Sequence, residues 1–188
     1  MEECIATIAI NIQYTPEDLL ALPDAGRYEL IDGQLVERNT GAKSSYVAAR
    51  LVRLLGLVTD AQELGLLFGS DCGYQIFADD PGRVRFADGS FIRRGRLPHD
   101  TPPEGHCRIP PDLAIEAISP NDTTRAVEEK VEQWLAASVR LVWVIYPDTQ
   151  RLDVHRHDGT VSKLRVDDVL SGEDVVPGFQ CQVTAIFQ

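Results

Sequence analysis

The chain has 188 residues, a length that fits one domain with a substantial core, so we predict a single domain over residues 1–188. Its 18 basic and 29 acidic residues give a net charge of −11, which argues against a broad polyanion-binding surface. No apolar run is long enough to span a bilayer, and the N-terminus lacks the pattern of a signal peptide. We therefore expect a cytoplasmic protein that does not bind membranes.

Neither the cysteines nor the histidines form a recognisable metal-binding or disulfide motif. His155 and His157 alternate on a predicted strand, with no thiol or further histidine close in sequence. The cysteines are scattered and include no CxxC pair: Cys4, Cys72, Cys107 and Cys181. We predict four reduced thiols and no zinc site.

Local signals in the first third of the chain predict a helix, a hairpin and a second helix. Thr15 followed by Pro16 is typical of a helix start. Residues 27–38 form two alternating runs around Asp32-Gly33, a dipeptide favoured in tight hairpin turns. Apolar residues then recur every three or four positions over 44–63, which predicts an amphipathic helix.

The remaining elements predict a mixed α/β fold, an α+β arrangement in which helices flank a mixed sheet. We expect strands over 66–77 and 84–92, followed by an exposed loop over 95–111. A strand over 111–120 then leads into a helix over 121–137. The apolar run over 141–147 is typical of a central strand buried on both faces, and shorter strands close the domain.

Two acidic strands carry the main functional signal, RFADGSFI at 85–92 and PDLAIEAISP at 111–120. Asp112 and Glu116 share one face of the second strand by period-two alternation, and Asp88 lies among apolar residues of the first. Unpaired buried carboxylates are costly, so several in one layer indicate a cation between them. Asp88, Glu116 and one backbone carbonyl would suffice for magnesium, which keeps several waters.

Lys130 belongs to the buried face of the predicted 121–137 helix, three residues after Val127 and four before Trp134. Its ammonium group can turn inward towards Glu116 or extend along the surface into solvent. Phosphodiester hydrolysis needs a metal to polarise the phosphate and a cation near the developing charge. Asp88, Glu116 and Lys130 together supply that set.

The order of these motifs resembles the Uma-type restriction endonuclease family over nearly the whole chain. The matching stretches are YELIDG at 28–33, FGSDCGYQI at 69–76, the two acidic strands, Lys130 and LVWVIYPDTQRLDVH at 141–155. The family belongs to the PD-(D/E)XK nuclease superfamily, with a restriction-endonuclease-like fold and one or two magnesium or manganese ions. The resemblance implies an endonuclease that uses Mg²⁺ or Mn²⁺ to hydrolyse DNA.

Carried over residue by residue, the resemblance makes Asp88 and Glu116 the metal ligands and Lys130 the residue that positions the attacking water. The chain departs from the superfamily pattern, because the usual lysine position, two residues beyond the acid, is Ile118. In the Uma-type family the lysine comes from the following helix, where Lys130 lies. Glu29 and Asp112 are further family-typical acids, either metal or water ligands or structural residues.

Two other functions stay open on the sequence alone. A catalytically inactive DNA-binding or protein-interaction domain, as a monomer or a homodimer, would suit the acidic charge and the displaced lysine. A hydrolase of smaller phosphate esters would suit an acidic protein better than duplex DNA does. Three arginines after the first acidic strand are candidate DNA-phosphate contacts, or else a solvated loop: Arg93, Arg94 and Arg96.

Overall fold

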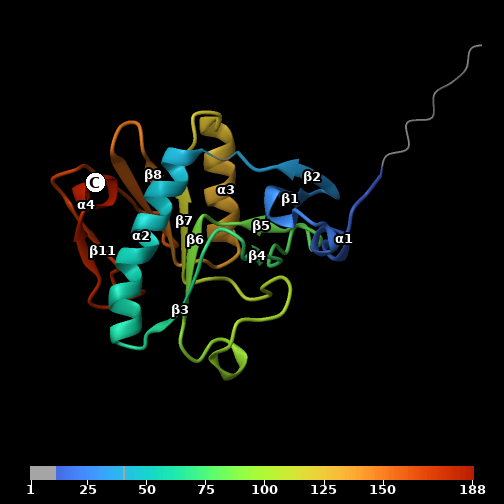
Figure 1. Ribbon diagram of the computed structural model, residues 1–188, viewed down its shortest axis with the longest axis horizontal. Coiled ribbons are helices and arrows are strands. Elements are labelled where there is room, and N and C mark those ends of the chain that lie inside the picture. Colours follow the sequence, from blue (N-terminus) through green and yellow to red (C-terminus); the bar gives the residue numbers. More distant parts are fainter. Residues whose placement is uncertain (1–11, 40) are drawn as a thin grey trace, which may run out of the picture.

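A six-stranded mixed sheet runs through the middle of the molecule (Figure 1). The computed structural model describes residues 12–39 and 41–188. Only β7 and β8 run parallel, and the other neighbouring strands are antiparallel. In spatial order the strands are β10 (Val161–Leu164), β9 (Arg151–Arg156), β8 (Leu141–Tyr146), β7 (Leu113–Ala117), β6 (Gly89–Arg93) and β3 (Gly65–Phe68). The predicted mixed sheet and the interior position of β8 are confirmed.

Helices α2 (Ala42–Ala61) and α3 (Thr124–Ala136) cover opposite faces of this sheet. In Figure 1, β7 lies between them. Leu51 of α2 packs in one core with Ile115, whereas Trp134 of α3 packs in the other with Ala114. Alternation along β7 therefore divides its side chains between two cores, and each large apolar side chain buried there contributes about 1.5–3 kcal/mol.

The N-terminal helix and hairpin form as predicted. Thr15 caps α1 (Pro16–Ala21) in a capping box. A short 3₁₀ turn, η1 (Ala25–Arg27), leads into β1 (Tyr28–Ile31) and β2 (Gln34–Glu37). Asp32 and Gly33 between the strands both have positive φ, 50° and 74°, as a tight hairpin turn of this class requires.

The two strands predicted over 66–77 and 84–92 are each broken, so that prediction is wrong in detail. The first region forms β3 and β4 (Gly73–Tyr74), and the second forms β5 (Arg85–Phe86) and β6. The break arises because β5 pairs with β4 in a separate ribbon, whereas β6 pairs with β3 and β7 in the main sheet. Asp88 lies in the bend between β5 and β6.

The loop over 95–111 includes a short 3₁₀ turn, η2 (Pro98–Asp100), and most of its residues are exposed, as predicted. His106 and Cys107 near its end are buried. Cys107 N donates to Gly73 O, and Cys107 O accepts from Gln75 N, so this segment extends the ribbon of β4. These backbone bonds explain the burial.

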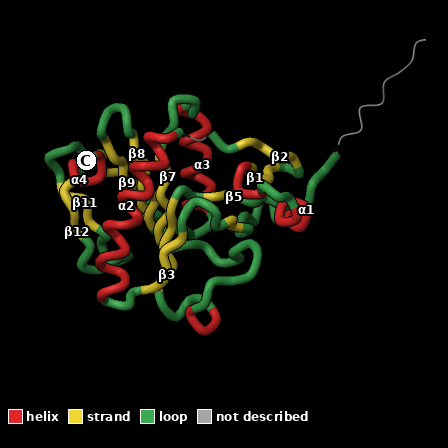
Figure 2. Tube along the Cα trace, in the orientation of Figure 1, coloured by secondary structure: helices red, strands yellow, loops and turns green. Residues whose placement is uncertain are grey.

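The C-terminal segment covers the side of the sheet on which α2 lies (Figure 2). It consists of β11 (Val169–Ser171), β12 (Gln180–Gln182) and α4 (Thr184–Phe187). Cys72, Cys107 and Cys181 are free thiols, as predicted, and Cys4 lies outside the described residues. Within the described ranges, no helix is long and apolar enough to cross a membrane.

Candidate active site

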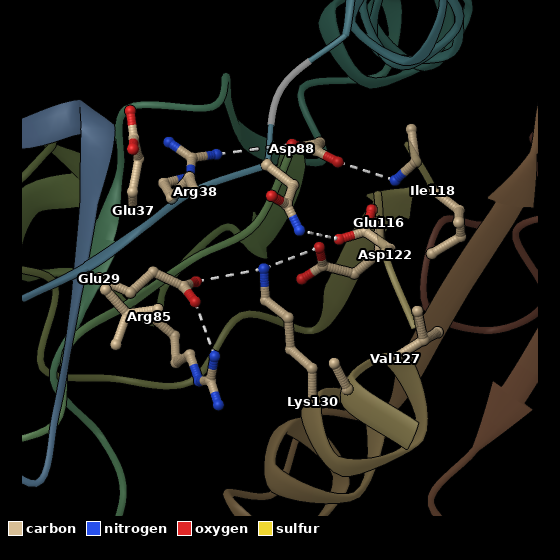
Figure 3. A pocket seen from close by; sticks show the side chains of 14 residues that line it. Glu29, Glu37, Arg38, Arg85, Asp88, Glu116, Ile118, Asp122, Val127 and Lys130 are labelled. Carbon is tan, nitrogen blue, oxygen red and sulfur yellow. Dashed lines mark hydrogen bonds and ion pairs between the residues drawn. The ribbon is translucent and has the colours of Figure 1, made fainter. Parts of the chain in front are cut away.

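Four of the residues predicted from the sequence line one pocket of about 160 Å³ (Figure 3). Glu29 comes from β1, Asp88 from the bend before β6, Glu116 from β7 and Lys130 from α3. Figure 3 shows Lys130 between the two glutamates. Elements distant in sequence thus bring three carboxylates and one ammonium group together.

Lys130 turns inward, where its ammonium group makes one hydrogen bond and two ion pairs. Its Nζ donates to Phe86 O at 2.9 Å and lies 2.9 Å from Glu116 Oε2 and 3.2 Å from Glu29 Oε1. Burial alone would lower the pKa of Lys130, but the charges of Glu116, Glu29 and Asp88 outweigh it and raise the pKa. Lys130 is therefore charged at neutral pH.

Glu116 is buried beside both like and opposite charges. Trp134 Nε1 donates to its Oε1 at 2.7 Å, and Lys130 contacts its Oε2. Burial raises its pKa to about 7, with Asp88 and Glu29 adding to the shift and Lys130 opposing it. Glu116 consequently changes charge near neutral pH, which is unusual for a carboxyl group and is typical of functional sites.

Glu29 differs from Glu116, because cationic partners dominate its surroundings. Arg85 Nη1 lies 2.6 Å from its Oε2, and Phe86 N donates to its Oε1 at 3.1 Å. Burial would raise its pKa, but Lys130, Arg85 and these hydrogen bonds lower it to about 2. Glu29 is thus a permanent anion that anchors Lys130 and Arg85, with both of its oxygens occupied.

Asp88 is more open than Glu29 and Glu116, with 29% of its side chain exposed. Ala117 N donates to its Oδ2 at 2.7 Å, which ties the bend to the end of β7. Arg38 approaches its Oδ1 at 3.5 Å. This long contact leaves Asp88 oxygens accessible to a ligand in the pocket.

Arg38 and Arg85 are site residues that the sequence reasoning missed. Arg38 follows β2 and donates to Gly26 O and Ser70 O at 2.8 and 2.9 Å, which fixes its guanidinium group near Asp88. Arg38 lies in the predicted hairpin and Arg85 in the first acidic strand, but neither was predicted to belong to the site. Their half-buried positions beside acids were the available signal.

A divalent metal fits only part of the predicted ligand set. Within residues 12–39 and 41–188, no group of three or more His, Cys, Asp or Glu side chains is arranged to hold a metal. Glu29 is saturated by its cationic partners. Asp88 and Glu116 remain as a pair, and magnesium commonly takes one or two carboxylates with waters. Burial is the main cause of the raised pKa of Glu116, and such an ion would offset the negative charges of Asp88 and Glu29 that raise it further.

The structure does not bring Asp112 to the pocket. Asp112 and Glu116 point to the same side of β7, but four residues of strand separate them by about 13 Å. Asp112 Oδ2 accepts from Arg93 N at 2.9 Å and from Arg96 Nη1 at 2.7 Å. These contacts give Asp112 a local role in fixing the loop after β6.

The three candidate phosphate-contacting arginines lie at the opposite end of β6 from Asp88. Arg96 is paired with Asp112, and Arg94 Nη1 lies 2.6 Å from Glu63 Oε2. The structure places Arg93, Arg94 and Arg96 outside the pocket. Their role in DNA binding stays a prediction, which salt-dependent binding of a triple alanine variant would test.

The comparisons with known proteins agree with this picture. The model of a family named Uma2, described as "Putative restriction endonuclease", matches residues 16–184. A crystal structure of a "putative nuclease" from Anabaena variabilis ATCC 29413 aligns with a TM-score of 0.76 and 20% identity, covering 92% of this chain and 97% of that chain. At this identity the likeness supports the fold. No curated protein matches the chain.

Proposed function

Because the chain belongs to the Uma2 family of putative restriction endonucleases, we propose that it is a divalent-metal-dependent endonuclease acting on DNA. One observation carries the proposal. Glu116, a buried carboxyl with a pKa raised to about 7, shares a pocket with the open carboxylate Asp88 and the charged Lys130. An acid pair beside an ammonium group is the set that phosphodiester hydrolysis requires.

Asp88 and Glu116 are the proposed ligands of Mg²⁺ or Mn²⁺. When bound, such an ion polarises the phosphate and lowers the pKa of a water molecule. Trp134 restricts the orientation of Glu116 through the bond to Oε1, which keeps Oε2 directed towards Lys130. The bond from Ala117 N does the same for Asp88.

Lys130 is the proposed group that orients the attacking water or neutralises charge on the phosphate. Its ammonium group is held by Phe86 O, Glu116 and Glu29, so one of these contacts must loosen before it can reach the substrate. An ion bound to Glu116 would weaken the contact between Glu116 and Lys130. One N–H group of Lys130 would then be free to donate a hydrogen bond to the water or the phosphate. Glu29, with its low pKa, would hold the ammonium group in place, which makes it a positioning residue rather than a metal ligand.

The test is calorimetric titration of Mn²⁺ into the wild type, Glu116→Gln and a control, Glu128→Gln. Glu128 is an exposed acid of α3 outside the pocket. We expect binding to the wild type and the control, no binding to Glu116→Gln, and cleavage of DNA, supplied both as a single strand and as plasmid, only where Mn²⁺ binds. Mn²⁺-dependent cleavage that persists in Glu116→Gln would overturn the proposal.

The small pocket and the net charge of −11 favour a second candidate, a hydrolase of small phosphate esters. Hydrolysis of bis-p-nitrophenyl phosphate without any DNA cleavage would identify it. Absence of Mn²⁺ binding would instead favour a catalytically inactive DNA-binding or protein-interaction domain. Light scattering would test the predicted homodimer.

A further inference from the structure

A second and larger hollow, of about 470 Å³, adjoins the active pocket at Asp88. The two share Arg38, Asn39, Asp88 and Ala117 in their walls. We call the second hollow the α2 cleft, because the first half of α2 forms one wall of it. Its position means that a ligand lying in the α2 cleft would continue directly to the proposed metal ligands.

Small side chains keep the α2 cleft open. Ser45 and Ala49 are exposed, lie one helical turn apart and are followed after another turn by Arg53, so the three form one stripe on α2. On the opposite side, a Cβ added at Gly69 would meet no atom within 4 Å. The walls therefore admit a ligand without any rearrangement of large side chains.

The α2 cleft has a balanced lining of two arginines and two aspartates, but one of its arginines is available to an anion. Among the described residues, Arg53 has neither an ion pair nor a side-chain hydrogen bond, and Arg38 lies at the junction with the active pocket. Helix α2 has no acidic residue in its first turn. Asp71 and Asp88 are the acids in the walls, and Asp88 is already contacted by Arg38.

The other cations of α2 are occupied, which makes Arg53 distinctive. Lys43 Nζ lies 2.7 Å from Asp148 Oδ1, and Arg50 Nε donates to Ala185 O at 3.0 Å. An exposed guanidinium group held beside a polar hollow is suited to phosphate, which accepts hydrogen bonds from its planar fork. The α2 cleft thus combines open space, an available arginine and continuity with the active pocket.

We propose that the α2 cleft binds the nucleotides that flank the scissile phosphate as a single unpaired strand. The inference rests on the proposed nuclease function and narrows its substrate to single-stranded DNA or unpaired ends. A hollow of this size lies within the range of about 300–1,000 Å³ that proteins use for one small ligand, so it has room for a short stretch of one strand and not for the width of a double helix. Because no aromatic residue lines it, hydrogen bonds and arginine contacts replace base stacking.

The test is fluorescence anisotropy in EDTA with a labelled single strand of about 12 nucleotides and the matching duplex. We expect the wild type to bind the single strand at least about tenfold more tightly than the duplex. Ala49→Trp fills the α2 cleft and should weaken single-strand binding about tenfold or more. Ala61→Trp, at an exposed position of the same helix outside the cleft, should leave it unchanged.

Arg53→Ala provides an independent measurement if Ala49→Trp does not fold by circular dichroism. Loss of one phosphate contact should reduce the slope of log affinity against log salt by about 0.7. Equal or tighter binding of the duplex by the wild type would overturn the inference. So would single-strand affinity that neither Ala49→Trp nor Arg53→Ala changes.

Cleavage assays separate failure of the inference from failure of the proposed function. Mn²⁺-dependent cleavage of duplex DNA that Ala49→Trp leaves intact would refute the single-strand inference and leave the nuclease proposal standing. Single-strand binding that depends on Ala49 and Arg53, with no cleavage in Mn²⁺, would refute the nuclease proposal while the α2 cleft remains a binding site.

Discussion

Substitution of Glu116 by glutamine should stabilise the metal-free protein at alkaline pH. Burial raises the pKa of Glu116 from 4.5 to about 7. A shift of one unit corresponds to about 1.36 kcal/mol, so the ionised carboxylate lowers the free energy of unfolding by roughly 3 kcal/mol above pH 7. The folded state holds the proton of Glu116 more tightly than the unfolded state does. The stability that this proton contributes is therefore fully present below pH 4.5 and is lost as pH rises through about 7.

The assay is urea unfolding of the wild type and Glu116→Gln in EDTA at about pH 5 and pH 8. The amide oxygen can still accept the hydrogen bond from Trp134 Nε1, so the packing is retained. We expect nearly equal stability at the lower pH and a gain of up to about 3 kcal/mol for the variant at the higher pH. With Mn²⁺ at about 100 times its dissociation constant, the wild type should gain about 2.7 kcal/mol and the variant nothing.

Glu29→Gln is the matched variant, and it should change the free energy of unfolding in the opposite direction. The pKa of Glu29 is lowered to about 2, so its charge stabilises the fold at neutral pH, and this stability is lost as pH falls from 4.5 through about 2. The variant should lose up to about 3 kcal/mol at pH 8. If both substitutions changed stability in the same direction at pH 8, the account of the charges in the pocket would be refuted.

Three further changes test individual contacts. Lys130→Met should lower turnover of DNA far more than it lowers Mn²⁺ affinity in calorimetry, and an equal loss of both would assign Lys130 to metal binding. Trp134→Phe removes a donor to Glu116, so the pH at which Mn²⁺ binding begins should rise by about one unit; an unchanged pH profile would contradict that role. Asp112→Asn should cost about 1–3 kcal/mol in urea unfolding with Mn²⁺ affinity unchanged, and weaker Mn²⁺ binding would return Asp112 to the site.

Local signals in the sequence were sufficient for the parts of the fold that depend on neighbouring residues. The cap at Thr15 and the turn at Asp32-Gly33 follow from the chemistry of single residues, and both form. Helical spacing placed Lys130 on the buried face of α3, and strand alternation placed Glu116 towards that helix. These two patterns left open whether the ammonium group turned inward, and the structure shows that it does, with Lys130 Nζ 2.9 Å from Glu116 Oε2.

The rest of the site depends on pairings between distant segments, which no local pattern encodes. Asp112 is an exception, because four residues of extended strand already imply about 13 Å between it and Glu116, so the sequence alone argued against a shared site. The bend at Asp88 exists because β5 and β6 join different sheets. The partners Arg38 and Arg85 reach the carboxylates through contacts made across 50 and 56 residues of chain.

The net charge of −11 is compatible with a nucleic-acid substrate once the local charges are separated. The walls of the active pocket hold more acids than cations, because Glu37 and Asp122 lie beside the three site carboxylates, so without a bound metal ion this pocket does not attract phosphate. The α2 cleft differs, because Arg53 is available there and the first turn of α2 has no acid. Most of the affinity for a strand should therefore arise in the α2 cleft, whereas the active pocket contributes the chemistry. The acidic remainder of the surface would repel nucleic acid that approaches from any other direction.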